Sequence, residues 1–150
     1  MPHHLIDIAN TVVAVVEPET TALQTAQLMR KHHVGALVVV EANDRTRPIG
    51  IVTDRDLVLA VMAEALDPAV FTASDIMSHD LVVARADLDL QGAIALMHER
   101  KVRRLVVVDE AGRLRGILTL EDVLEALSGD MAALVVGMRG ARDREFAQRR

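Results

Sequence analysis

The chain has 150 residues, of which 51% are hydrophobic, and it carries a formal net charge of −5 at pH 7 with no cysteine. This length suits one compact domain or two small units that share a core, and the lack of cysteine excludes a disulfide framework and is typical of a cytoplasmic protein. The negative charge and the 1% aromatic content argue against nucleic-acid binding, and we expect neither a membrane span nor a signal peptide, because no apolar run approaches the roughly 18 residues that cross a bilayer.

The first half of the chain predicts the order strand, helix, strand, strand, helix. A β-branched run that ends at Val16 is typical of a short strand, and Thr20 or Thr21 can cap the helix that follows. The unbroken apolar run from Leu37 to Val40 indicates a strand buried on both faces. The predicted strands cover residues 11–16, 37–40 and 49–52, the helices cover about 20–33 and 54–66, and a polar turn covers 41–48.

The second half repeats that order after a link. Asp87 can cap its first helix, and the stretch from Asp109 to Gly112 is typical of a turn. Beyond Gly129 an apolar stretch leads into an Arg-rich end, where we expect a further helix that packs on the rest of the chain or on a partner and frays at its end. The predicted strands cover residues 81–84, 105–108 and 114–118, and the helices cover about 87–100 and 120–127.

One motif occurs twice and divides the chain into two units. Residues 50–57 read Gly-Ile-Val-Thr-Asp-Arg-Asp-Leu, and residues 116–123 read Gly-Ile-Leu-Thr-Leu-Glu-Asp-Val, 66 positions later. Before the motif, equivalent residues of the two units are 68 positions apart. The first unit therefore has two extra residues between these positions and the motif, and they fall in the polar turn around 43–47. A unit of about 60 residues buries its own sheet poorly. Two units packed sheet to sheet about a pseudo-twofold axis would solve this, with ligand sites in the crevices between them.

The order β-α-β-β-α and the pattern Gly-hydrophobic-x-Thr-x-x-Asp, each present twice, resemble a tandem pair of cystathionine β-synthase (CBS) domains, also called a Bateman module. The resemblance implies a mixed α/β (α+β) fold, with two such repeats packed sheet to sheet. It covers about residues 5–128. The domains are then a first repeat at 1–66, a linker at 67–74, a second repeat at 75–128 and a C-terminal helix or tail at 129–150.

Members of this family are regulatory modules, so the resemblance implies two clefts for adenosine-type ligands, namely AMP, ADP, ATP or S-adenosylmethionine. It implies a ribose-binding Thr–Asp pair, a polar residue before the first strand, strand residues against the adenine, and basic residues facing the phosphates. In this chain these positions are Thr53, Asp56, Thr119 and Asp122 (ribose), Asn10 and Ser78 (polar), Val12, Val13, Ala36, Leu81, Val82 and Arg104 (adenine), and Arg103 and Arg104 (phosphates).

The Thr–Asp pairs also have a purely structural interpretation. Thr53 and Asp56 have the spacing of a capping box, in which the hydroxyl and the carboxylate each accept a backbone N–H at the start of a helix. The same geometry points a carboxylate at the crevice, where it can accept hydrogen bonds from the two hydroxyls of a ribose. Both roles can hold at once.

The basic residues are expected to make the two clefts unequal. The first repeat has Gly35 and Ala36 where the second has Arg103 and Arg104. Because neighbouring side chains on an extended segment alternate, we expect only one of the two arginines to reach a given cleft. It would form a bidentate phosphate clamp; the alternative is a solvated basic pair. Arg55, on the first turn of its helix, can face an anion or pair with a nearby acid.

Six histidines invite a metal hypothesis, but none forms a His-x-x-x-His or His-Glu-x-x-His pattern, so we expect no metal site. His79 stays a candidate ligand contact because it adjoins Ser78. We find no cysteine nucleophile, Gly-x-Ser-x-Gly elbow, Walker loop or Gly-x-Gly-x-x-Gly sequence, so we predict no catalytic residue and no required cofactor.

Three hypotheses for the function follow. The first is a non-enzymatic sensor that binds an adenine nucleotide between its repeats, changes their packing or that of a homodimer (head-to-head or head-to-tail) and signals to an effector protein. The second is a structural dimerisation module that binds no nucleotide. The third is an enzyme of the response-regulator type with Asp109 as phospho-acceptor, which predicts an acidic cluster and five parallel strands; the internal repeat argues against the second and third hypotheses.

Overall fold

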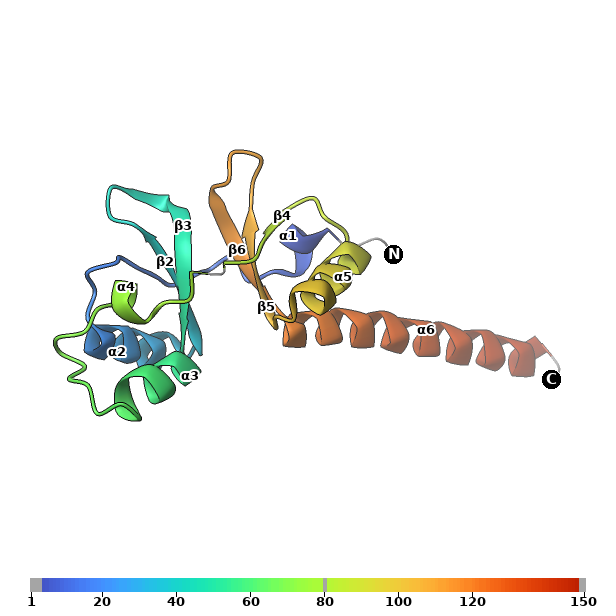
Figure 1. Cartoon of the computed structure of the whole chain (residues 1–150). Coiled ribbons are helices and arrows are strands. Elements are labelled where there is room, and N and C mark those ends of the chain that lie inside the picture. Colours follow the sequence, from blue (N-terminus) through green and yellow to red (C-terminus); the bar gives the residue numbers. More distant parts are fainter. Residues whose placement is uncertain (1–3, 80, 149–150) are drawn as a thin grey trace.

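The computed structural model describes residues 4–79 and 81–148 and consists of two similar bodies whose sheets face each other (Figure 1). In the first body, β1 (Val15–Val16) pairs in parallel with β2 (Ala36–Glu41), which pairs antiparallel with β3 (Asp44–Thr53). In the second body, β4 (Val83–Arg85), β5 (Arg104–Val108) and β6 (Leu114–Thr119) repeat this order and these directions. The expected fold class is therefore confirmed.

Each sheet is covered on its outer face by helices. In the first body these are α2 (Ala22–His32), α3 (Asp54–Asp56) and the π-helical turn η1 (Leu57–Met62). Thr21 begins α2 with a capping box, accepting a hydrogen bond from the Gln24 backbone at 3.1 Å. In the second body they are α5 (Leu90–Arg100) and α6 (Leu120–Gln148).

The buried strands β2 and β5 alternate between two cores, as a strand covered on both faces must. In β2, Leu37 and Val39 face the helices, while Val38 and Val40 face the other sheet. Val106 and Val108 of β5 meet Val38 and Val40 in this inter-sheet core, and all four are at least 94% buried. The bodies are thus held together by a layer of valines.

Two short helices are exchanged between the bodies. Helix α1 (Leu5–Ile8) precedes the first repeat but packs on the second, where Leu5 is fully buried and donates its backbone N–H to the Leu88 carbonyl at 2.9 Å. Helix α4 (Ala73–Ile76) precedes the second repeat but packs on the first, where Ala73 is fully buried. Neither helix was predicted from the sequence, and their exchange ties the repeats together.

Several predicted boundaries are wrong. The strand expected at residues 11–16 is formed only at Val15–Val16, and β3 begins at Asp44, inside the expected turn. The cap of α5 is Asp89, which accepts the Gly92 backbone N–H at 2.7 Å, whereas Asp87 pairs with Arg85 at 3.2 Å. Both aspartates have the right chemistry, and the position of the buried face of α5 selects the second.

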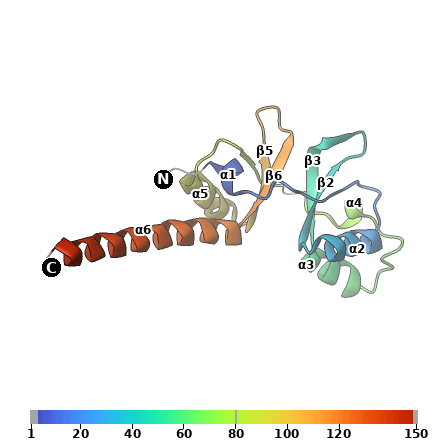
Figure 2. The same cartoon turned by 180° about the vertical axis from the view of Figure 1, so that it is seen from behind.

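The helix that was expected to end near residue 127 continues without a break to Gln148. Gly129 does not end it, because glycine makes a helix less stable than alanine does but still adopts helical backbone angles. Both views show the outer half of α6 projecting away from the two bodies (Figures 1 and 2). Among the described residues, no helix combines the length and the apolar character that a membrane span requires.

The glycine of the repeated motif is required where an exchanged segment crosses a strand. A Cβ on Gly116 would lie 2.9 Å from the backbone oxygen of Asn10, so the backbone would have to move. A Cβ on Gly50 would meet first the flexible side chain of Met77, at 2.5 Å from its sulfur.

We predict that Gly116→Ala lowers the free energy of unfolding by about 1–3 kcal/mol, the usual cost of overpacking, and that Gly50→Ala costs less. Urea unfolding monitored by circular dichroism measures both. Gly129→Ala is the matched control and should stabilise the chain, because helical alanine is favoured over glycine by roughly 0.5–1 kcal/mol. A Gly116→Ala variant as stable as the wild type would contradict this account of the crossing.

Candidate functional site

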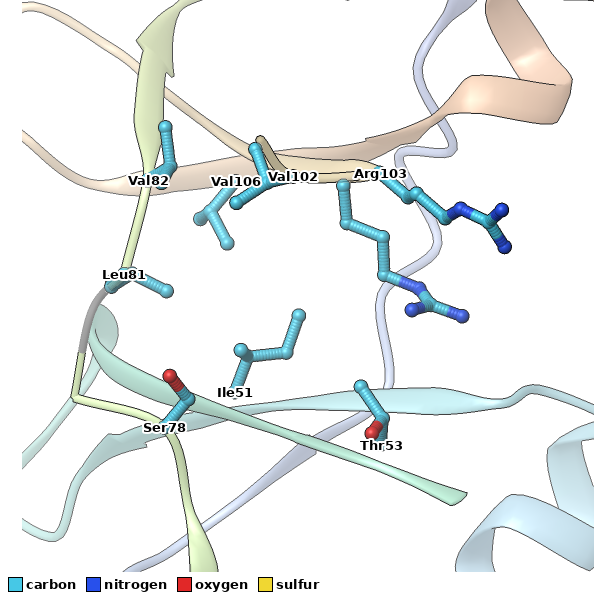
Figure 3. Close-up of a pocket in the computed structure, with 9 residues that line it drawn as sticks. Ile51, Thr53, Ser78, Leu81, Val82, Val102, Arg103 and Val106 are labelled. Carbon is cyan, nitrogen blue, oxygen red and sulfur yellow. The ribbon is translucent and has the colours of Figure 1, made fainter. Parts of the chain in front are cut away.

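A first cleft lies between the two bodies, at the end of β3 (Figure 3). Its volume is about 270 Å³. In Figure 3, Leu81 and Ser78 lie at one end of the cavity, and Thr53 and Arg103 at the other. The lining residues come from both repeats: Ile51, Thr53, Ser78, Leu81, Val82, Val102, Arg103, Arg104 and Val106.

A second cleft of about 230 Å³ repeats this arrangement with the repeats exchanged. Thr119 takes the place of Thr53, and Asn10 takes the place of Ser78. The lining residues are Asn10, Val34, Gly35, Ala36, Arg104, Ile117, Thr119 and Asp122. Each cleft therefore takes the Thr-containing motif from one repeat and the facing strand from the other.

Pairs of backbone hydrogen bonds fix the polar residue of each cleft next to the motif. The Ser78 N–H donates to the Ile51 carbonyl at 2.9 Å, and the Ile51 N–H donates back at 3.4 Å. Asn10 and Ile117 exchange the equivalent bonds at 2.9 and 3.0 Å. Ser78 and Asn10 lie two residues after the ends of the exchanged helices α4 and α1. The exchange itself therefore builds the clefts.

Both Thr–Asp pairs form capping boxes, as the structural interpretation predicted. The Asp56 N–H donates to the Thr53 hydroxyl at 3.1 Å, and the Thr53 N–H donates to Asp56 Oδ2 at 2.8 Å. Thr119 and Asp122 form the same pair of bonds at 3.1 and 2.9 Å. Within the part of the chain that the structure describes, neither aspartate uses Oδ1 for a hydrogen bond, so each cap leaves one carboxylate oxygen for another donor.

The two arginines depart from the expectation. Arg103 and Arg104 both line the first cleft, although strand alternation predicted that only one would. The reason is that β5 begins at Arg104, so Arg103 lies on a bend where alternation does not apply. Arg104 also lines the second cleft, whose other residues at these positions are the uncharged Gly35 and Ala36. The first cleft is therefore the more cationic one.

Five of the predicted site residues do not line either cleft. Val12 is 85% exposed, Val13 packs into the inter-sheet core, and Arg55 and His79 are exposed. Asp56 lies next to the first cleft through its hydrogen bonds to Thr53. The predicted residues that line the clefts are Asn10, Ala36, Thr53, Ser78, Leu81, Val82, Arg103, Arg104, Thr119 and Asp122.

Sequence reasoning missed most of the apolar lining. Ile51 and Ile117 follow the glycine of the repeated motif, and Val34 and Val102 occupy equivalent positions of the two repeats. The repeat itself carried this signal, because an apolar residue kept at the same place in both units lines the same part of both clefts. Val106 also lines the first cleft.

Asp109 holds a turn together, which differs from the role of phospho-acceptor that the third hypothesis gave it. Its carboxylate accepts the backbone N–H groups of Ala111 and Arg113 at 2.9 Å, and the Arg113 guanidinium at 3.0 Å. The Arg113 backbone N–H, followed by its side chain, holds the pKa of the Asp109 carboxyl below its usual value. The five parallel strands expected for that hypothesis are contradicted by two mixed sheets of three strands.

Among the described residues, no group of three or more His, Cys, Asp or Glu side chains could hold a metal ion.

The chain belongs to the CBS domain family. The family model matches residues 5–63 and 73–129, one match for each repeat. This confirms the tandem CBS pair that the repeated motif indicated, and members of this family are regulatory ligand-binding modules.

Two relatives resemble the chain over most of its length. An uncharacterised protein of Methanopyrus kandleri, MK0525, is 38% identical over 119 residues, which cover 79% of this chain and 60% of that protein. Hypoxic response protein 1 of Mycobacterium tuberculosis is 36% identical over 121 residues, covering 81% of this chain and 82% of that protein. The chain thus spans less than two thirds of the first relative.

Solved structures share the fold. The crystal structure of Hypoxic Response Protein I with two coordinated zinc ions aligns with a TM-score of 0.71 and 36% identity over 82% of this chain and 98% of that one. The CBS domain protein PAE2072 from Pyrobaculum aerophilum, complexed with AMP, aligns with a TM-score of 0.74 and 22% identity over 85% of this chain and 99% of that one.

Proposed function

We propose that the protein is a non-enzymatic regulatory module that binds an adenosine-type ligand in its two clefts. The observation that carries this proposal is the composition of the first cleft, in which the Thr53–Asp56 cap of one repeat faces Arg103 and Arg104 of the other. The ligand would be AMP, ADP, ATP or S-adenosylmethionine. We further propose that residues 1–66 and 75–128 form the two repeats and that residues 129–150 form a C-terminal extension.

Each part of such a ligand has a chemical counterpart in the first cleft. Asp56 Oδ1 is left to accept a ribose hydroxyl, and Thr53 can add a further hydrogen bond. The purine would lie between aliphatic side chains, since Ile51, Leu81 and Val106 line the cavity. Arginine suits phosphate because its guanidinium donates two parallel hydrogen bonds, and Arg103 extends at the same end of the cavity as Thr53 (Figure 3).

The two clefts would differ in what they hold best. The second has the Thr119–Asp122 cap and Asn10 but only Arg104 as a basic residue. It therefore favours ligands with less phosphate charge, while the first favours ADP or ATP. Because Arg104 lines both clefts, a phosphate bound in one competes with the other for this guanidinium.

Ligand binding would act as a signal through the packing of the two bodies. Each cleft includes residues of both repeats, so a bound ligand stabilises one arrangement of the bodies over others, and only such differential affinity can shift an equilibrium. The change would be read by an effector protein or across a homodimer, and the proposal places the protein in the cytoplasm. The structure of PAE2072 complexed with AMP supports the capacity of this fold for such ligands. The choice of ligand rests on the residues of this chain.

Thermal unfolding should separate this proposal from a purely structural dimerisation module. A nucleotide at about 100 times its Kd stabilises the folded state by about 2.7 kcal/mol, a shift of several degrees in Tm for a chain of this size. We predict such a shift for at least one of AMP, ADP, ATP and S-adenosylmethionine, and its loss in the double variant Asp56→Ala, Asp122→Ala.

Asp75 provides the matched control for this experiment. It forms a capping box with Thr72 at 2.9 Å, as the site aspartates do, but neither Asp75 nor Thr72 lines a cleft. Asp75→Ala should lower the Tm of the free protein and keep the full ligand-induced shift. No shift with any ligand, in protein free of copurified nucleotide, would favour the structural module.

The shared position of Arg104 gives a second prediction, for calorimetric titration with ADP. Hydrogen bonds to charged groups contribute roughly 1.5–3 kcal/mol, so Arg103→Ala should weaken one of two binding events by about 10–100-fold and leave the other unchanged. Arg104→Ala should weaken both. Arg85→Ala is the control, because Arg85 pairs with Asp87 and Glu110 at the surface. Equal effects of Arg103→Ala and Arg104→Ala would contradict the sharing of Arg104.

A further inference from the structure

The outer half of α6 carries an apolar stripe that nothing covers in the single chain. Every residue from 128 to 140 is exposed. Met131, Leu134 and Met138 are 68%, 66% and 64% exposed, and Leu124 is 56% exposed. Leu127, which is half-buried and packs in part against the core of its own body, continues the series. These residues follow one another at alternating intervals of three and four, which is the heptad spacing of a helix that packs along another helix.

A helix with this composition is poorly stable on its own. Most helical stability in proteins comes from packing an amphipathic face, and isolated helices are marginal in water. Three glycines, Gly129, Gly137 and Gly140, weaken α6 further, and each has open space where its Cβ would be. They lie off the heptad positions, so they lower the helix propensity without interrupting the stripe. A partner that covers the stripe would supply the missing stability.

The charges along α6 indicate what that partner is. The first half of the helix carries four acidic residues and no basic one, whereas the outer half carries three arginines and two acidic residues, a net charge of +1 (Glu121, Asp122, Glu125 and Asp130; Arg139, Arg142, Arg144, Asp143 and Glu145). Two copies of such a helix attract each other when they run antiparallel, because the acidic half of one then lies beside the basic half of the other. A parallel pair would place like charges together.

We propose that α6 pairs with α6 of a second copy of this chain as a two-stranded antiparallel coiled coil. Pairing around residues 132–133 sets Met131 against the partner's Leu134 and Leu127 against the partner's Met138. The same register brings Ser128 beside the partner's Val135, because both residues occupy a heptad position that flanks the apolar stripe. This assembly rests on the stripe and the charges of α6 alone, so it stands or falls independently of the nucleotide proposal.

Cross-linking tests the pairing directly, because the chain contains no cysteine. Ser128→Cys and Val135→Cys are made in separate proteins, which are mixed and treated with a short bis-maleimide. We expect a covalent dimer that joins Cys at 128 to Cys at 135, identified by peptide mass spectrometry. Dimers joined only between identical positions would indicate a parallel pair, and the absence of any cross-link would leave the stripe to another partner; either result overturns the proposal.

Two exposed positions on α6 provide a matched pair of variants. Leu134, in the stripe, and Val136, outside the heptad positions, are 66% and 67% exposed. Leu134→Asp should abolish the 128–135 cross-link and raise the dimer dissociation constant, measured by sedimentation, about 100-fold or more, because a twofold interface loses the residue twice. Val136→Asp should leave both unchanged. The proposed pairing along the stripe would be contradicted if cross-linking persisted in Leu134→Asp. It would also be contradicted if Val136→Asp abolished cross-linking as fully as Leu134→Asp.

Discussion

The structure depends on the place where the start of each repeat crosses the end of the other. At Ile51 and Ile117, pairs of backbone hydrogen bonds hold Ser78 and Asn10 against the opposite repeat. The crossing requires a glycine one residue earlier, because a side chain at Gly116 would meet the backbone of Asn10. This single constraint explains the first residue of the repeated motif and the exchange of α1 and α4, and it builds both clefts from both repeats.

The last part of the motif serves folding and binding together. Each Thr–Asp pair caps a helix, which satisfies backbone donors that would otherwise lack partners. Each cap uses one carboxylate oxygen and, among the described residues, leaves the other without a hydrogen bond; Asp122 lines the second cleft, and Asp56 is bonded to Thr53, which lines the first. A site built in this way is preorganised, because the side chains that would meet the ligand are already fixed by the helix that they begin. It also means that stability and binding must be measured separately in variants of these aspartates.

Much of the fold follows from the sequence, since the doubled motif and the apolar runs at Leu37–Val40 and Leu105–Val108 identify two repeats and their buried strands. The Thr–Asp caps and Arg103–Arg104 followed from the same motif and the family resemblance. What the sequence did not reveal depends on tertiary contacts: the exchange of α1 and α4, the choice of Asp89 over Asp87 as a cap, and the way that Arg104 lines both clefts. The continuity of α6 through Gly129 was also missed, because glycine makes a helix less stable but still adopts helical backbone angles.

The central claim is that each ligand site is built by both repeats. Titration of the isotopically labelled protein with ATP, monitored through its backbone amide resonances, tests this most directly. Binding in the first cleft should shift the amides of Thr53 and Asp56 together with those of Ser78, Arg103 and Arg104, although these residues belong to different repeats. Shifts confined to the residues of one repeat, or located away from both clefts, would contradict the account.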